Sequence, residues 1–233
     1  MPKPHHFLRK ITAVALTAVF LSACAGTTGL MEAHQEATAE ETLITWLTEL
    51  AAYQATATVT YVSNKNVNHY QISHIATRGG SYLIEVIAPE RLAGNVTLSD
   101  GEHIFQLHRG LGYKIALGTV DNHETKERTS LLLTNFAEAF LAGEGVVTSI
   151  DTGEHQLSVP VSSQHRYIAR LQLVMDATLN PISLISYDVH GEQRIVVSYS
   201  DFVPNPDIDM SVFNIQQMEE IVSFGDKQDT STD

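Results

Sequence analysis

The segment Tyr53-Gln-Ala-Thr-Ala-Thr-Val-Thr-Tyr61 decides the fold of this chain. Its side chains alternate with a period of two, apolar residues against threonines: Ala57, Val59 and Tyr61 against Thr56, Thr58 and Thr60. In a β-strand this period places the two sets on opposite faces, and threonine, valine and tyrosine favour a pleated, half-buried surface. The segment therefore predicts a strand that begins near Tyr53 and turns one face towards a core.

Turn-forming residues follow this strand at short intervals. Ser63–Asn66, Gly79-Gly80 and Asp100-Gly101 are typical of turns, and the runs around them have strand-like patterns. We expect strands at residues 67–77, 81–88, 95–99, 102–108, 113–117, 146–151, 156–161, 166–176, 182–189 and 193–199. Because short turns join nearly all of them, the sequence predicts a mostly β (α+β) protein with one antiparallel sheet curled around a core and helices against one face.

Two segments have the period of a helix instead. Thr38 and Glu41 fit the capping-box pattern, and a helix is expected over residues 39–52 with one apolar face: Leu43, Ile44, Trp46, Leu47, Leu50 and Ala51. A second amphipathic helix is expected over residues 130–142, ending at Gly143, with a wide apolar stripe: Leu132, Leu133, Phe136, Ala137, Phe140 and Leu141.

The N-terminus has the organisation of a secretory signal peptide. Basic residues precede the uncharged run Ile11–Leu21, and small residues lead to Cys24, the only cysteine of the chain. The run is too short to cross a bilayer core of about 30 Å as a mature helix. We therefore expect residues 1–23 to be removed.

The ending Leu21-Ser-Ala-Cys24 resembles the lipobox of bacterial lipoproteins. That resemblance implies a diacylglycerol-modified Cys24 and cleavage just before it; the alternative is an ordinary signal peptide with a chance cysteine. Residues 24–37 then form a lipidated tether, residues 38–218 one domain and residues 219–233 a polar tail. The expected location is the extracytoplasmic face of the cell membrane, with Cys24 as the lipid anchor.

The negative net charge of the chain favours attachment to the membrane through acyl chains rather than through electrostatic adhesion. Its net charge is −13, and removal of a signal that holds three of the 14 basic residues and no acidic one leaves 11 against 27, or −16. Such a chain is not expected to bind nucleic acid, nor to adhere to anionic lipid by charge. A single cysteine also allows no disulfide within the chain, so its stability must come from packing.

Four stretches carry a resemblance to a known superfamily: Tyr61-Val-Ser-Asn-Lys-Asn66, Tyr82-Leu-Ile-Glu-Val-Ile-Ala-Pro-Glu90, Gly94-Asn-Val-Thr-Leu-Ser-Asp-Gly101 and Val197-Ser-Tyr-Ser-Asp-Phe-Val-Pro-Asn-Pro206. In their order they resemble the LolA/LolB/RseB-like superfamily over residues 38–215, and most of all its Gram-positive LolA-like and germination (GerS-type) lipoproteins. The resemblance implies an open half-barrel of antiparallel strands whose concave face is covered by two or three helices. Residues 103–108 depart from the Trp- or Tyr-rich strand that is common there.

No motif for catalysis or for metal binding is evident. The 11 histidines include no His-x-His on a strand and no His-x-x-x-His on a helix after residue 23, and Gly-x-Ser-x-Gly, P-loop and His-Glu-x-x-His motifs are absent. An acylated Cys24 cannot act as a nucleophile. We therefore expect a binding protein without a cofactor rather than an enzyme. A hydrolase ranks third, well behind the two binding hypotheses described next.

Two kinds of binding remain open. The first is capture of a lipid or lipoprotein acyl chain in the concave face, because alternation places five apolar residues on one side of adjacent strands: Tyr82, Ile84, Val86, Phe105 and Leu107. The second is a partner-binding scaffold. The resemblance to GerS-type lipoproteins implies a role in germination, as the support of a cell-wall (cortex) amidase.

Overall fold

The computed structural model describes residues 38–120, 131–149, 153–161 and 168–216. The expected signal peptide (1–23), tether (24–37) and tail (219–233) lie outside the described residues, and Cys24 with them. Among the described residues, no helix is both long enough and apolar enough to span a membrane.

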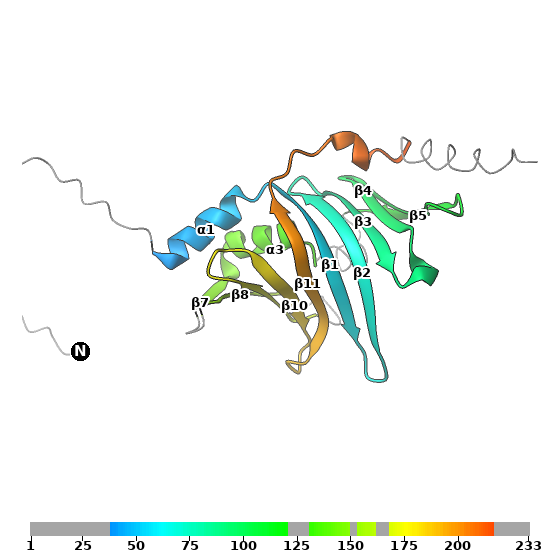
Figure 1. The fold of residues 1–233 in the computed structure, drawn as a ribbon. Helices are drawn as coiled ribbons and strands as arrows, with labels where there is room; N and C mark the ends of the chain where they lie inside the picture. The colour runs from blue at the N-terminus through cyan, green and yellow to red at the C-terminus, as the bar shows by residue number, and fades with distance from the viewer. Residues whose placement is uncertain (1–37, 121–130, 150–152, 162–167, 217–233) are drawn as a thin grey trace, which may run out of the picture. The chain divides into compact units, whose positions relative to one another are not determined.

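The described residues form one antiparallel sheet (Figure 1). Its strands run in the order β6-β5-β4-β3-β2-β1-β11-β10-β9-β8-β7. Their bounds are β1 (Ala52–Val62), β2 (Val67–Thr77), β3 (Ser81–Ala88), β4 (Asn95–Asp100), β5 (His103–His108), β6 (Lys114–Thr119), β7 (Val146–Ser149), β8 (His155–Pro160), β9 (Arg170–Met175), β10 (Pro181–Tyr187) and β11 (Gln193–Pro204). The predicted antiparallel meander is confirmed, and the sheet is open rather than a closed barrel.

The order of the strands determines where the helices lie. The first and last strands, β1 and β11, pair at the centre of the sheet, so its two edges, β6 and β7, are neighbours in the sequence. The chain between these edges contains α3 (Leu133–Ala139), which contacts β2 and therefore crosses one face of the sheet. Figure 1 shows α3 behind β10 and β11; we call the face on this side the inner face and the opposite face the outer face.

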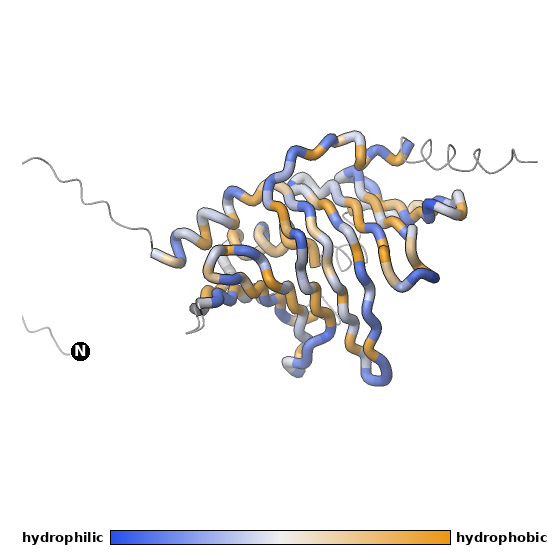
Figure 2. The backbone as a smooth tube through the Cα atoms, viewed as in Figure 1, coloured by the Kyte–Doolittle hydropathy of each residue, from blue (hydrophilic) through white to orange (hydrophobic). Residues whose placement is uncertain are grey.

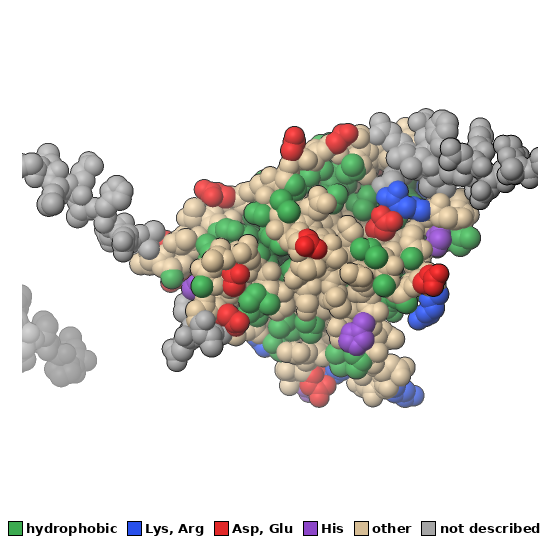
Figure 3. All heavy atoms as spheres, in the orientation of Figure 1, with side chains coloured by type: hydrophobic (Ala, Val, Ile, Leu, Met, Phe, Trp, Pro, Cys, Tyr) green, Lys and Arg blue, Asp and Glu red, His purple; other side chains and the backbone are tan. Residues whose placement is uncertain are grey.

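On β1, the strand that decides the fold, buried and more exposed side chains alternate as the sequence predicts. On β1 the inner face holds buried Tyr53, Ala55, Ala57 and Val59, and Thr58 is exposed between them. Figure 2 shows this alternation as changes of colour along the strands. On the face of Figure 3, which lies away from α3, apolar side chains are interspersed with polar ones. Burial of the inner apolar set therefore holds the register of the central strands.

Helix α1 (Ala39–Glu49) begins as predicted. The Glu41 N–H donates to Thr38 Oγ1 (3.2 Å) and the Thr38 N–H donates to Glu41 Oε2 (2.8 Å), which completes the capping box. The helix ends three residues before the predicted end, because the Asn205 side chain donates to the Glu49 carbonyl (3.0 Å) and accepts from the Ala51 N–H (2.8 Å). This cap turns the chain directly into β1.

The second helix is shorter than predicted and changes its form. After α3 the chain continues as the π-helix η2 (Phe140–Glu144), which Gly145 caps. Gly143, inside η2, has a positive φ of 108°, a conformation that favours glycine. Most of the predicted apolar stripe is buried, but Leu141 is 37% exposed. The expectation that Leu141 shares the buried face is therefore wrong: this residue lies in η2, beyond the end of the regular helix α3.

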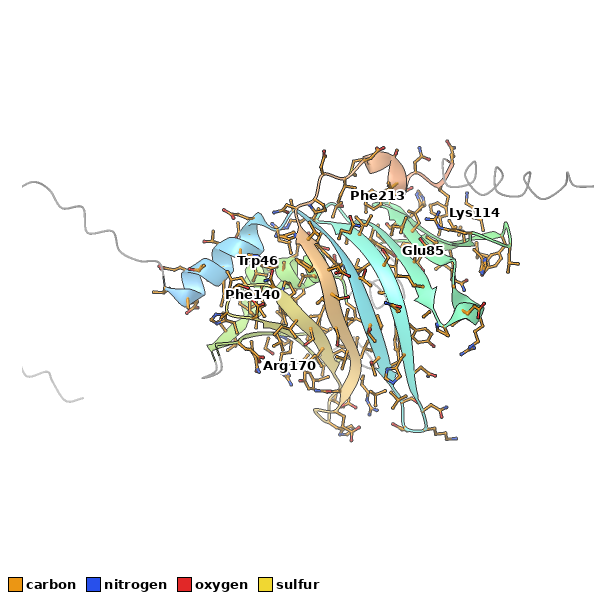
Figure 4. The ribbon with its side chains drawn as sticks, viewed as in Figure 1. Trp46, Glu85, Lys114, Phe140, Arg170 and Phe213 are labelled. Carbon is orange, nitrogen blue, oxygen red and sulfur yellow. The ribbon has the colours of Figure 1, made fainter. Side chains whose placement is uncertain are left out.

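A second apolar cluster covers part of the outer face. The short helix η3 (Met210–Phe213) contacts β3 and β4, and the other short helix, η1 (Glu90–Leu92), follows β3. Phe213 is buried in this cluster (Figure 4) together with four strand residues: Leu83, Val96, Leu98 and Leu107. Strands β3 to β5 therefore have apolar side chains on both faces.

Candidate ligand-binding cavity

A cavity of about 780 Å³ lies on the inner face of the sheet, beside the start of α3. Most of its wall comes from four neighbouring strands: Val59, Tyr61, Asn68, Tyr70, Ile72, His74, Tyr82, Ile84, Val86 and Thr97. The rest comes from two other parts of the chain: Arg194, Ile195 and Val197 on β11, and Leu131, Leu132 and Ile168 outside the strands. Its volume lies in the range of small-molecule sites, roughly 300–1,000 Å³.

The register of the strands explains why these side chains share one wall. His74 pairs with Ala55 on one side and Ile84 on the other, and Ile84 pairs with Thr97. Directly opposite residues of an antiparallel pair point to the same face. One row of side chains therefore runs from β1 to β4 across the inner face, and Ile72 and Val86 form the next row.

Tyr82, Ile84 and Val86 line the cavity, but Phe105 and Leu107 do not. Phe105 pairs with Leu98 and Leu107 with Val96, all of which lie on the outer face. The expectation that all five residues share one face is therefore wrong for Phe105 and Leu107. The physical reason is the second cluster: it buries apolar side chains of β5 on the outer face, so apolar character alone does not identify the inner face.

Phe105 and Leu107 have other neighbours on the outer face. The Lys114 ammonium lies 5.1 Å from the centroid of the Phe105 ring, and Leu107 is buried near Phe213. Both residues thus support the packing of the outer face. The role of Tyr82, Ile84 and Val86 as contacts for a ligand stays a prediction.

Polar aromatic side chains lie at the buried end of the cavity. The Tyr53 hydroxyl is 3.4 Å from His74 Nδ1 and accepts a hydrogen bond from the Leu133 N–H (3.2 Å). The Tyr199 ring stacks on the His74 ring, with 5.7 Å between the centroids and 11° between the planes. Burial lowers the pKa of His74 to about 4, and it raises the pKa values of Tyr53 and Tyr199, so all three are uncharged at neutral pH.

A charged side chain lies at the exposed end of the cavity. There Tyr61 is 43% exposed and Arg194 forms part of the wall. The Arg194 guanidinium donates to Asp188 Oδ2 (Nε, 2.7 Å) and to Glu192 Oε2 (Nη2, 2.8 Å), so two carboxylates compensate its charge. Arg194 is therefore engaged by its own neighbours and offers no free positive charge to an anion.

The sequence reasoning missed His74 and Arg194. A signal for His74 was present, because it follows Tyr70 and Ile72 at intervals of two and so shares their face. No comparable signal existed for Arg194, which reaches the cavity through the pairing of β1 with β11. Among the residues that the structure describes, no group of three histidine, cysteine or acidic side chains could hold a metal ion.

The resemblance to LolA-like proteins implied an open antiparallel sheet with helices on one face, and this mostly β architecture is confirmed. The chain belongs to the sporulation protein YdcC-like family, whose model matches residues 9–213. None of the curated proteins compared with the chain matches it.

Several solved structures are similar to the chain. One is the complex of the CwlD amidase from Clostridioides difficile with the GerS lipoprotein (24% identity, 72% of this chain and 97% of the matched chain covered, TM-score 0.46). A second is the LolA superfamily protein NE2245 from Nitrosomonas europaea (13% identity, 78% and 100% covered, TM-score 0.43). A third is LprF from Mycobacterium bovis (10% identity, 72% and 95% covered, TM-score 0.39).

Proposed function

We propose that this protein is a lipoprotein, anchored to the extracytoplasmic face of the cell membrane through Cys24, that binds an acyl chain in its inner-face cavity without catalysis. The observation that carries the proposal is the cavity itself, about 780 Å³ with a mainly apolar wall. Each methylene group buried there contributes about 0.8 kcal/mol. An acyl chain therefore gains affinity along the whole length of the wall.

The length of the cavity suits an acyl chain. His74 and Asn68, six residues apart on β2, both line it, and a strand rises about 3.3 Å per residue, so the wall extends roughly 20 Å. One leaflet of a bilayer core, which is half of about 30 Å, has a comparable length. The exposed position of Tyr61 provides an entrance at the end near Asn68.

The chemistry of the wall supports binding without catalysis. The described lining residues include no serine, cysteine, aspartate or glutamate, which are frequent nucleophiles or general acids and bases. His74 is buried and Arg194 is held by two carboxylates. What the wall offers to a ligand is an apolar surface with a few fixed polar groups.

The anchor rests on Cys24 and on the order of the segments before it. In this proposal residues 1–23 are removed, residues 24–37 connect the lipidated cysteine to the domain, and residues 38–218 form that domain. A single acyl chain gives only reversible attachment, whereas a lipidated cysteine carries more than one and holds the protein at the membrane.

A substitution in the wall of the cavity tests the binding function. Ile84→Glu places a carboxylate among apolar side chains, where its burial without a partner is costly, so capture of lipid should fall sharply. Ile87→Glu is the matched control, because Ile87 lies on the same strand, is 44% exposed and does not line the cavity. Lipid extracted from each purified variant is quantified by mass spectrometry. Equal lipid in both variants and the wild type would refute binding in this cavity.

A partner-binding scaffold is the second candidate, and the edge strand β6 favours it. β6 pairs with β5 on one side and forms an edge of the sheet on the other, and the exposed apolar residues Leu111, Tyr113 and Ile115 lie on it or just before it. An unpaired edge can accept a strand from another protein. In this reading the partner is a cell-wall amidase.

The two candidates are separated by a substitution on that edge. Ile115→Lys leaves the cavity wall intact, so loss of amidase capture with normal lipid content would favour the scaffold. Loss of lipid in Ile84→Glu with normal amidase capture would favour the carrier.

A further inference from the structure

Tyr53, His74 and Tyr199 form a polar aromatic cluster at the buried end of the cavity, and small residues on β1 make room for it. His74 pairs with Ala55, and Tyr199 pairs with Ala57, which places β1 between their two strands. Because alanine side chains are short, the His74 and Tyr199 rings reach over β1 and stack. The cluster is therefore built into the register of the three central strands.

Hydrogen bonding within the cluster favours one tautomer of His74. The Tyr53 oxygen already accepts from the Leu133 N–H, and its own O–H lies within reach of His74 Nδ1 (3.4 Å). If Tyr53 donates to Nδ1, both the hydroxyl and Nδ1 are satisfied, and the proton of the neutral imidazole lies on Nε2. The opposite tautomer would leave the buried Tyr53 hydroxyl proton without an acceptor in the cluster.

Two buried donors of the cluster then lack an acceptor. His74 Nε2 and the Tyr199 hydroxyl have no hydrogen-bond partner among the described residues, although His74 lines the cavity and is only 2% exposed. Buried polar groups are nearly always hydrogen-bonded, so an unpartnered donor at a cavity wall calls for an acceptor from outside the chain. Of the two residues only His74 lines the cavity, and a ligand carbonyl oxygen there could accept from its Nε2–H.

The charges around the cavity indicate that this acceptor is uncharged. Arg194 is the one charged side chain of the described wall, it lies at the opposite end, and Asp188 and Glu192 already compensate it. A carboxylate brought to His74 would be buried without a counter-charge, which is costly. A neutral ester carbonyl satisfies the donor without that cost.

We infer that the cavity binds an uncharged acyl ester with its carbonyl oxygen at His74, which donates the hydrogen bond from Nε2–H, and with its hydrocarbon chain along Ile72 and Tyr70 towards the entrance at Tyr61. This inference rests on the proposed function and names the class and the orientation of its ligand. His74 here positions the ligand and takes part in no reaction.

The test compares two probes that differ only in the acceptor: the methyl ester of a saturated fatty acid and the alkane of the same length. The full chain is equilibrated with an equimolar dispersion of both, and the bound ratio is measured by mass spectrometry. Wild type should prefer the ester about tenfold, the effect of one buried hydrogen bond. His74→Leu should lose this preference and still bind both probes. His69→Leu is the control: it lies on the same strand, contacts Thr60 and is not a lining residue, so its preference should match the wild type.

Each outcome has a definite reading. Equal binding of both probes by the wild type, or an ester preference that survives His74→Leu, overturns this inference and leaves the proposed function standing. Binding of neither probe by the wild type overturns both. If His74→Leu does not fold, nitrogen-15 NMR of the wild-type histidines replaces it: the His74 Nε2–H resonance should shift with the ester and not with the alkane, and equal spectra overturn the inference.

Discussion

Replacement of Phe136 by alanine should destabilise the domain by about 3–5 kcal/mol, the usual cost for a fully buried phenylalanine. Phe136 is 0% exposed and lies in the main apolar cluster, on the helix that crosses the inner face. Its ring also stacks with that of Phe140 at a centroid distance of 6.2 Å, and such a pair adds about 0.5–1.5 kcal/mol beyond the buried area. We therefore expect the upper half of the range.

The assay is urea denaturation followed by circular dichroism, with a thermal melt as a second measurement. For a domain of 150–250 residues a loss of 1 kcal/mol lowers the Tm by about 2–4 °C, so a loss of about 4–5 kcal/mol in Phe136→Ala should lower it by roughly 8–20 °C. Leu141→Ala is the control, because Leu141 belongs to the same predicted stripe but is 37% exposed, and it should cost less than about 1 kcal/mol. A loss below about 1 kcal/mol for Phe136→Ala would refute the packing and would mean that this face of α3 is free to bind something else.

Three further predictions concern other parts of the chain. The folded domain should lose stability as the pH falls from 6.5 to 4: burial lowers the pKa of His74 from 6.5 to about 4, so the unfolded chain takes up the proton first, and at about 1.36 kcal/mol per pKa unit the loss is roughly 3 kcal/mol. Urea titrations across this pH range should show the loss of stability in the wild type and not in His74→Leu; the same pH dependence in both proteins would contradict the prediction. Gly145→Ala should destabilise the domain by about 1–3 kcal/mol in the same assay, because the added Cβ would overlap the Phe140 ring; a neutral effect would show that the ring moves freely. Cys24→Ser should release the protein from the membrane fraction or leave its precursor uncleaved, and normal processing and fractionation of this variant would rule out the lipid anchor.

Local chemistry made the strands and turns predictable. The second and third strands match their predicted bounds, residues 67–77 and 81–88, because Ser63–Asn66 and Gly79-Gly80 determine where the chain reverses. The start of α1 could also be predicted from the sequence, since the capping box is contained in four consecutive residues. Each of these features depends on neighbours in the sequence.

The face of a strand is harder to predict when both faces are apolar. On β3 the consecutive residues Tyr82 and Leu83 are both buried, one against the cavity and the other in the second cluster. Only the path of the C-terminal segment, which places Phe213 on the outer face, distinguishes them. Phe105 and Leu107 were assigned to the wrong face because that long-range packing has no local signature.

The cavity residues of β11 show the same dependence on long-range pairing. Val197 lines the cavity because it pairs with Val59, a residue more than a hundred positions away. The alternation of β11 shows that Ile195 and Val197 share a face, but the register of β1 with β11 decides what that face meets. A sequence pattern therefore identifies the strands of this site and not the site itself.

The position of the polar aromatic cluster links the packing of the domain to its proposed activity. An unpartnered buried donor lowers stability by about 1–3 kcal/mol. Two of the unpartnered polar atoms among the described residues belong to His74 and Tyr199, whose rings stack on each other. Phenylalanine at position 199 would remove one donor and keep its ring, whereas leucine at position 74 would remove the other donor together with the acceptor of the Tyr53 hydroxyl. The fold thus accepts a cost at the end of an otherwise apolar cavity, and a ligand oxygen bound there would offset it. On this reasoning Tyr199→Phe should be more stable than the wild type without ligand, because it keeps the ring and removes one unpartnered donor. His74→Leu should lose the preference for an ester, an effect that a purely structural histidine would not produce.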